Sequence, residues 1–109
     1  MCISSNMKVA GIQWDAGNWP KCGKHGVSRE EIETVLRTMT IRIPDPFPEE
    51  ERYRTAKILP DGRAVFVVFT HRTKDGRLYL RPVSARYMHG KEIESYERAE
   101  KALAQPSDR

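Results

Sequence analysis

Two arginines that lie close together in the sequence could bind a phosphate group. Arg81 and Arg86 stand at the ends of the segment Pro82-Val83-Ser84-Ala85, which follows an apolar run. The planar guanidinium of arginine can donate two parallel hydrogen bonds to two phosphate oxygens. Because the two arginines are five positions apart, they cannot both point to one face of an undistorted strand. Either the strand breaks at Pro82, or only one of the arginines lines a site.

The charge of the chain is concentrated in its middle. The 109 residues carry 19 Lys and Arg against 15 Asp and Glu, a net charge of +4. Residues 52–91 hold ten basic residues against only Asp61 and Asp75, whereas residues 1–51 and 92–109 are each acidic by two charges. A basic block between acidic ends is typical of a surface that binds a polyanion. The alternative is a solvated surface that happens to be basic.

Cleavage of RNA without a metal ion would need few groups. A base takes the proton of the ribose 2′-hydroxyl, cations stabilise the pentacoordinate phosphate, and an acid protonates the leaving 5′-oxygen. Arginines suit the second role, and Lys, His, Glu or Tyr with a shifted pKa suit the others. Side chains available for these are His25, His71, Tyr53, Tyr79 and Tyr87. The residues alone favour a module that only binds nucleic acid or protein over such a nuclease.

Other chemistries find little support in the sequence. It contains no phosphate-binding glycine loop, serine nucleophile elbow or dinucleotide-binding turn. Cys22 and His25 have a spacing seen in metal sites, and Cys2, His71 and His89 could add ligands. A structural zinc site usually needs four ligands, however, and there is no second paired motif. We therefore expect no cofactor and no metal, with reduced thiols and a buried or capping role for Cys22. A zinc-binding regulator remains as an alternative.

The size of the chain predicts one domain, over residues 7–104, with a flexible tail at 1–6 and a frayed end at 105–109. Two halves of such a chain would each be too small to bury a useful core. No apolar run approaches the roughly 20 residues that span a bilayer, and no signal-peptide pattern is present. The expected location is the cytoplasm.

The elements that must position these residues include one clear helix, which begins after Ser28. Ser28 and Glu31 have the spacing of a capping box, and Val27 and Ile32 occupy the positions of a hydrophobic staple. Apolar side chains then recur at helical spacing, at Ile32, Val35, Leu36 and Met39. A shorter helical stretch is expected within 15–26, and a last helix over about 88–104.

Apolar and alternating runs predict strands at 8–14, 40–43, 52–59, 64–69 and 78–83. The strand 64–69 is apolar on both faces and should be central. The segment 44–48 holds three prolines, which cannot donate to a β-ladder, and is predicted to be a loop. Pro82 should likewise lie at a sheet edge or where pairing ends. The elements predict an α+β fold, a small antiparallel sheet of three or four strands with helices packed on one face.

Several short motifs together resemble the BrnT toxin family. In chain order they are Trp14-Asp15, Lys24-His25-Gly26-Val27-Ser28 with Glu30-Glu31, Glu51-Arg52, Val67-Val68-Phe69-Thr70 with Arg72, Arg81-Pro82-Val83-Ser84-Ala85-Arg86, and Glu92 to Tyr96-Glu97. The resemblance implies a RelE-like fold and a ribonuclease toxin of a type II toxin–antitoxin system, which inhibits translation and growth. It also implies an RNA substrate and a BrnA-like ribbon-helix-helix antitoxin, through which alone the toxin would meet operator DNA.

The same resemblance implies a set of catalytic residues. They are Lys24, His25, Glu51, Arg52, Arg81 and Arg86. The three arginines would bind phosphate and stabilise charge in the transition state, and Lys24, His25 or Glu51 would transfer protons. Other roles are open for some of them. The segment Lys24-His25-Gly26 could simply end a helix, and Arg81 and Arg86 could pair with Glu92 or Glu97. Trp14 is expected in the core. Trp19, beside Pro20, could be exposed, and it would then be a candidate contact for a partner or a base.

Overall fold

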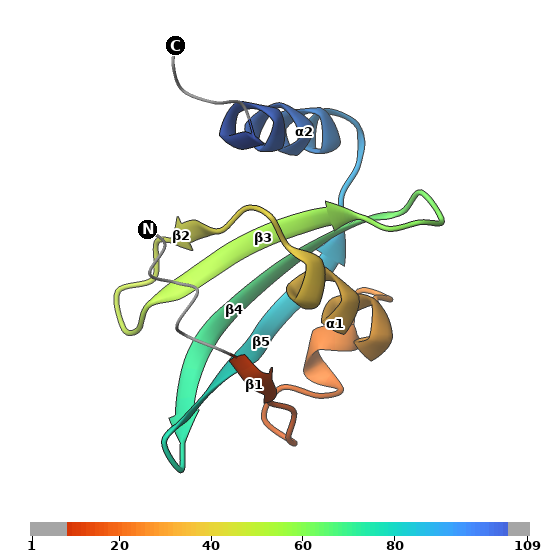
Figure 1. Ribbon diagram of the computed structural model, residues 1–109. Coiled ribbons are helices and arrows are strands. Elements are labelled where there is room, and N and C mark those ends of the chain that lie inside the picture. Colours follow the sequence, from red (N-terminus) through yellow and green to blue (C-terminus); the bar gives the residue numbers. More distant parts are fainter. Residues whose placement is uncertain (1–8, 105–109) are drawn as a thin grey trace.

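The computed structural model describes residues 9–104. The predicted tails at 1–6 and 105–109 lie outside these residues. The elements in chain order are β1 (Val9–Ile12), the 3-10 helix η2 (Lys21–Gly23), α1 (Arg29–Thr38), β2 (Ile43–Asp45), β3 (Arg52–Ile58), β4 (Ala64–Lys74), β5 (Arg77–Tyr87) and α2 (Gly90–Ala104). Figure 1 shows their arrangement around one curved sheet.

The sheet has five strands in the order β1-β5-β4-β3-β2. The apolar strand β4 is central, as predicted. β1 runs parallel to β5, whereas all the other neighbouring strands are antiparallel. The α+β class is therefore confirmed, but the prediction of three or four antiparallel strands is corrected to a mixed sheet of five. The run 8–14 predicted a strand near β1, but nothing in it indicates which distant strand it joins.

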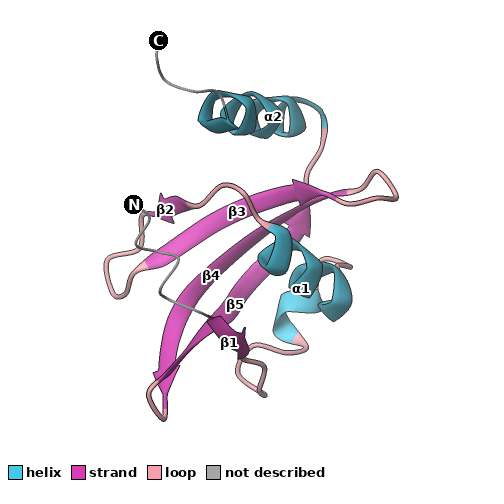
Figure 2. Cartoon of the chain, viewed as in Figure 1, coloured by secondary structure: helices cyan, strands magenta, loops and turns pink. Residues whose placement is uncertain are grey.

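Helix α1 packs on one face of this sheet (Figure 2). The predicted capping box is present, since Ser28 Oγ accepts from the Glu31 backbone N–H and Glu31 accepts from that of Ser28. The buried side chains of the helix meet those of the central strand, which on this face are Val65, Val67 and Phe69. This face of the sheet carries the main core.

Helix α2 packs on the opposite face, which differs from the prediction that the helices share one face. Its side chains Ile93 and Tyr96 lie against a small cluster formed by Ala56, Ala64 and Met88, with Phe66. Because strand residues alternate between faces, Phe66 points away from the side of Val65 and Val67. A central strand that is apolar on both faces needs cover on both, and α2 covers one end of the second face.

Strand β2 corrects the prediction of a loop at Pro44. The strand lies at the edge of the sheet, and Pro44 is opposite Tyr53 of β3. An edge strand can tolerate proline because one of its sides has no partner that needs the missing N–H. The predicted strand 40–43 thus overlaps the observed Ile43–Asp45 in one residue only.

Candidate active site

A β-bulge in β5 decides where its arginines point. Ser84 lies opposite Val68 of β4, and Pro82 lies opposite the next residue, Phe69, so that Val83 is an extra residue on β5. An extra residue reverses the alternation of side chains along the bulged strand. The strand therefore changes the facing of its side chains between Pro82 and Ser84 without ending.

Arg81 and Arg86 consequently point to the same side of the sheet. Arg86 lies opposite Phe66 and Arg81 opposite Thr70, and these two β4 residues share a side because they are four positions apart. Arg52 of β3 lies opposite Thr70 on its other flank, so it joins them. The bulge thus resolves the parity problem posed by the sequence.

Pro82 lies inside β5 but beyond its pairing with β1. The register of β1 with β5 covers residues 78–80, and the backbone N–H of Gln13 donates to the Leu80 carbonyl at 2.8 Å. The Pro82 carbonyl instead accepts from Asn18 Nδ2 at 3.0 Å. The prediction that pairing ends at Pro82 is therefore confirmed on the β1 side, whereas pairing with β4 continues past it through the bulge.

Five arginines gather on the side of the sheet opposite α1, and Arg77, at the β4–β5 hairpin, has the same facing. Arg54 and Arg72 join the three above because each is two positions from Arg52 or Thr70 on its own strand. We call this set the arginine face, and it consists of Arg52, Arg54, Arg72, Arg81 and Arg86. It extends from the region beside β1 to the end of the sheet under α2.

Carboxylates of the same chain hold the two β5 arginines. Arg81 donates to both carboxylate oxygens of Asp15 at 2.8 and 3.0 Å and to Gln13 Oε1 at 2.9 Å. Arg86 makes a two-bond pair with Glu92, at 2.9 and 2.8 Å. The hydrogen bonds from these guanidiniums lower the pKa of Asp15 and of Glu92. The alternative pairing of Arg86 with Glu92 is confirmed, whereas Arg81 pairs with Asp15 instead.

Glu50 lies between two further arginines. Arg52 Nε donates to Glu50 Oε2 at 2.8 Å, and Arg72 Nη1 donates to Oε1 at 3.2 Å. The hydrogen bond from Arg52 holds the pKa of Glu50 below its ordinary value, and the charge of Arg72 acts in the same direction. The guanidinium of Arg52 also lies 3.6 Å from the centre of the Phe47 ring. Glu50 is therefore an ionised carboxylate inside the arginine face.

Glu51, which the resemblance implicates, belongs to a different group of residues. Its carboxylate accepts from the Tyr53 hydroxyl at 3.3 Å, and the Tyr53 ring lies 5.1 Å from that of His71. Arg42 Nη1 is 3.4 Å from His71 Nε2. Burial of the His71 ring and the nearby charge of Arg42 lower the pKa of His71. Because Tyr53 also packs on Phe69, this group lies on the α1 side.

Lys24 and His25 also lie apart from the arginine face. Both are exposed, and they follow η2, where Lys24 is the C-cap. The next residue, Gly26, has a φ of 93°, and its carbonyl accepts from the Tyr87 hydroxyl at 3.4 Å, on the side where Tyr87 also bonds Glu31 of α1. The interpretation of Lys24-His25-Gly26 as a helix end is thus confirmed. Of the six residues that the resemblance implicates, the structure brings together Arg52, Arg81 and Arg86.

The tryptophans and Cys22 have structural contacts. Trp14 and Trp19 pack edge to face at 5.3 Å, and both rings border the main core. Trp19 is half-buried, with its ring close to Gly23, so the alternative of an exposed Trp19 does not hold. Cys22 is buried, and burial raises the pKa of its thiol. Across residues 9–104, no three His, Cys, Asp or Glu side chains are grouped as a metal site would require.

Sequence reasoning missed Glu50, although a signal for it exists. Glu49, Glu50 and Glu51 follow one another before β3, and only one of them is an even number of positions from Arg52. Strand alternation extended back by one step would have selected Glu50. Glu51 stands in the motif, but it is an odd number of positions from Arg52.

Comparisons with known proteins agree with the resemblance. The family described as "Ribonuclease toxin, BrnT, of type II toxin-antitoxin system" matches residues 14–92 of the chain. This range includes η2, α1, the strands β2 to β5 and every residue of the arginine face. A search of curated proteins gives no match. No helix within the described residues is long and apolar enough to cross a membrane.

Proposed function

The chain belongs to the BrnT family of ribonuclease toxins of type II toxin–antitoxin systems, and on this premise we propose that its arginine face cleaves RNA without a metal ion. The observation that carries the proposal is the bulge at Val83, which gives Arg81 and Arg86 the same facing as Arg52. Guanidiniums along one side of a sheet can bind successive phosphates of an RNA strand, and those beside the scissile phosphate can stabilise the charge of its transition state.

In this proposal Glu50 takes the proton of the ribose 2′-hydroxyl. The 2′-oxygen then attacks phosphorus, the bond from phosphorus to the 5′-oxygen breaks, and the leaving oxygen takes a proton from water. Glu50 is ionised and lies between Arg52 and Arg72. When a phosphate draws these guanidiniums away, the carboxylate loses hydrogen bonds that lower its pKa and becomes a stronger base. We assign proton transfer to Glu50 because Lys24, His25 and Glu51 lie apart from the arginines.

The test is direct. Purified protein free of antitoxin is incubated with single-stranded RNA in the presence of EDTA, and the products are analysed by mass spectrometry. We expect fragments that end in a 2′,3′-cyclic phosphate and begin with a 5′-hydroxyl, and we expect induction of the protein in cells to slow translation and growth. If RNA stays intact and growth is unchanged, the chain is not an active nuclease.

The expected partner is a BrnA-like antitoxin with a ribbon-helix-helix part, which would neutralise the toxin in the cytoplasm and bind operator DNA for both. The family, which is defined by toxin–antitoxin pairs, supports this proposal. Where a small ribbon-helix-helix protein is encoded next to this chain, its co-expression should restore growth and allow both proteins to be purified together. A complex that shifts operator DNA, while the toxin alone does not, is the expected result.

A second candidate function is a non-catalytic module that binds an acidic segment. The observation that favours it is the two-bond pair of Arg86 with Glu92, because the arginine face already binds carboxylates within the chain. Replacement of Arg52 and Arg86 would then weaken binding of an acidic partner, and the wild type would show no cleavage. The nuclease assay above separates the two functions.

A further inference from the structure

A cavity of about 460 Å³ lies between α2 and the sheet, at one end of the arginine face. Its volume falls in the range of roughly 300–1,000 Å³ that is usual for small-ligand sites. Its walls come from β2, β3, β4, β5 and α2, with Arg54, Phe66 and Arg86 on the sheet and Tyr96 on the helix. Figure 1 shows α2 standing over one end of the sheet.

The lining combines cations with aromatic rings. Arg54, Arg86 and Lys91 supply positive charge, against the single carboxylate of Glu92. The guanidinium of Arg86 lies 4.5 Å from the centre of the Phe66 ring. In single-stranded nucleic acid, bases stack on aromatic rings and on guanidinium planes, while phosphates bind the cations. The cavity therefore has groups for both parts of a nucleotide.

Tyr96 supplies the ring that comes from the helix. It packs edge to face with Phe66, with the ring centres 6.2 Å apart, and it is half-buried. Edge-to-face packing leaves part of at least one ring face free for a further partner. A base that entered the cavity would thus meet a side chain from α2 as well as those of the sheet.

The cavity is continuous with the proposed site of cleavage. Arg86 belongs to both, and Arg54 is two positions along β3 from Arg52, on the same side. Successive phosphates of an extended strand could therefore bind Arg52 and then Arg54. We propose that the cavity is a nucleotide subsite, which takes the base and phosphate of the RNA residue next to the scissile bond. This inference rests on the proposed function for the identity of the ligand.

An acidic peptide would be a poorer match for the same cavity. Its carboxylates could bind Arg54 and Lys91, but they would leave the rings of Phe66 and Tyr96 without a stacking partner. A base uses the rings and the cations together. The chemistry of the lining therefore favours RNA, and binding of an acidic peptide becomes an outcome that the experiment can detect.

The experiment uses the full chain and an 8-nucleotide RNA in which every 2′-hydroxyl is methylated, so that binding is measured without cleavage. A parallel set of probes lacks the base at one position at a time. We expect Tyr96→Leu and Arg54→Gln each to weaken binding of the complete probe about tenfold, as the loss of one stacked base or one phosphate contact predicts. Tyr96→Phe, which keeps the ring, should bind nearly as the wild type does.

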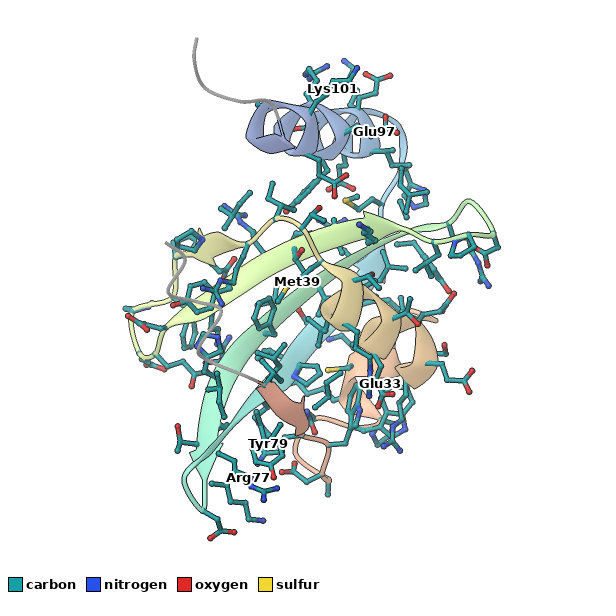
Figure 3. The ribbon with its side chains drawn as sticks, viewed as in Figure 1. Glu33, Met39, Arg77, Tyr79, Glu97 and Lys101 are labelled. Carbon is teal, nitrogen blue, oxygen red and sulfur yellow. The ribbon has the colours of Figure 1, made fainter. Side chains whose placement is uncertain are left out.

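One probe of the abasic set should distinguish the two variants. When the probe lacks the base that enters the cavity, Tyr96→Leu should not reduce the affinity any further. Arg54→Gln should still weaken binding of this probe. Arg77→Gln is the matched control, since Arg77 is exposed at the β4–β5 hairpin, at the other end of the sheet from α2 (Figure 3). Thermal melting of each variant reports whether α2 is still packed.

The possible results separate the two proposals. If the wild type cleaves RNA and the variants bind all probes as it does, the subsite is wrong and the nuclease stands. If the variants lose binding as expected but the unmethylated RNA is never cleaved, the subsite stands and the nuclease is wrong. Equal effects of Tyr96→Leu on every abasic probe, or tighter binding of a poly-glutamate peptide than of RNA, would overturn the subsite.

Discussion

Each guanidinium of the arginine face lies near a carboxylate of its own chain, and the closest pairs differ in exposure. The side chain of Arg81 is 16% exposed and that of Arg86 is 44% exposed. Exposed ion pairs contribute little to folding, because water and salt screen them. Glu92 can therefore give up Arg86 to a phosphate at low cost, whereas Arg81 keeps its orientation through Asp15 and Gln13.

Arg81→Gln should reduce RNA cleavage by roughly a hundredfold, since it removes one oriented donor of transition-state charge. The main effect should be on kcat, measured with saturating RNA. Arg77→Gln carries the same charge change at an exposed position and should cleave RNA as the wild type does. An equal loss in both variants would mean that net charge, and not the place of Arg81, matters.

Glu50→Gln should lower kcat by roughly a hundredfold and change KM much less, because Gln still accepts from Arg52 but cannot take a proton. In the wild type, kcat/KM reports the free enzyme. Its acid limb should lie below pH 4.5, because the Arg52 hydrogen bond lowers the pKa of Glu50 from that value. The acid limb of kcat should lie at higher pH. In the complex, the bound phosphate accepts the hydrogen bonds of Arg52 and Arg72, which then no longer lower the pKa of Glu50. An acid limb near the ordinary histidine value of about 6.5 would instead point to a histidine.

At the scale of elements, the start of α1 is tied to one end of the sheet by one carboxylate. Glu31 closes the capping box, accepts from the Tyr87 hydroxyl at 2.7 Å and lies 3.2 Å from Arg63 Nη2. Burial by itself would raise the pKa of Glu31, but the hydrogen bonds from Ser28 and Tyr87 and the charge of Arg63 outweigh it and lower the pKa.

The capping box predicts a definite stability change. Ser28→Ala should lower the free energy of unfolding by about 1 kcal/mol, the usual value for loss of such a cap, measured by urea denaturation near pH 7. Glu31 has a lowered pKa in the folded state, so its contribution is present above about pH 4.5 and is lost as the pH falls through the lower folded value. Glu31→Gln should remove this part of the pH dependence.

The matched control is Glu30→Gln, which alters the neighbouring acidic residue of the same first turn. It should leave the pH dependence of unfolding almost as in the wild type. If Glu30→Gln and Glu31→Gln change the pH dependence of unfolding equally, this dependence comes from the negative charge at the helix start and not from the contacts of Glu31.

Local patterns predicted the elements well and their long-range partners poorly. Ser28 and Glu31 are three positions apart, so the helix start could be identified from sequence alone. The parity of Arg81 and Arg86 indicated a distortion between them, but not that Val83 is the bulged residue, which depends on the register with β4. The parallel partner of β1 could not be predicted either, because it lies more than 60 positions away.

In the candidate site, too, local patterns predicted the residues in paired strands better than the position of residues elsewhere. Arg52, Arg81 and Arg86 came together because they are in strands that pair, whereas Lys24 and His25 follow a short helix whose position no local pattern determines. Glu51 was displaced from the arginines by a single step of strand alternation. A sequence motif does not tell which of two adjacent residues faces a site. Only the alternation of side chains along the chain distinguishes Glu50 from Glu51.

At the scale of the whole molecule, the sheet separates two chemically different sides. The α1 side holds the main core and the group of Tyr53, His71 and Arg42. The opposite side carries the arginine face, with α2 over one end only. An extended basic surface of this kind binds a polyanion by releasing its counterions, so that affinity falls with salt.

The salt dependence of the RNA affinity should therefore report how many phosphates the arginine face binds. For the methylated RNA, the slope of log K against log salt should become less steep by about 0.7 for each arginine that contacts one phosphate and is replaced by Gln. Arg52→Gln and Arg54→Gln are each expected to show this change in filter binding, and Arg77→Gln is not. A slope that none of the variants alters would place the RNA elsewhere on the molecule.

The pairing of Arg86 with Glu92 and of Arg52 with Glu50 has one more consequence. These carboxylates are tethered competitors, whose effective concentration at the guanidiniums does not fall when the protein is diluted. A free nucleotide has to displace them one at a time, whereas a strand that carries several phosphates displaces them together. The chain would thereby discriminate against the abundant mononucleotides of the cell and in favour of long RNA, with no group devoted to reading length.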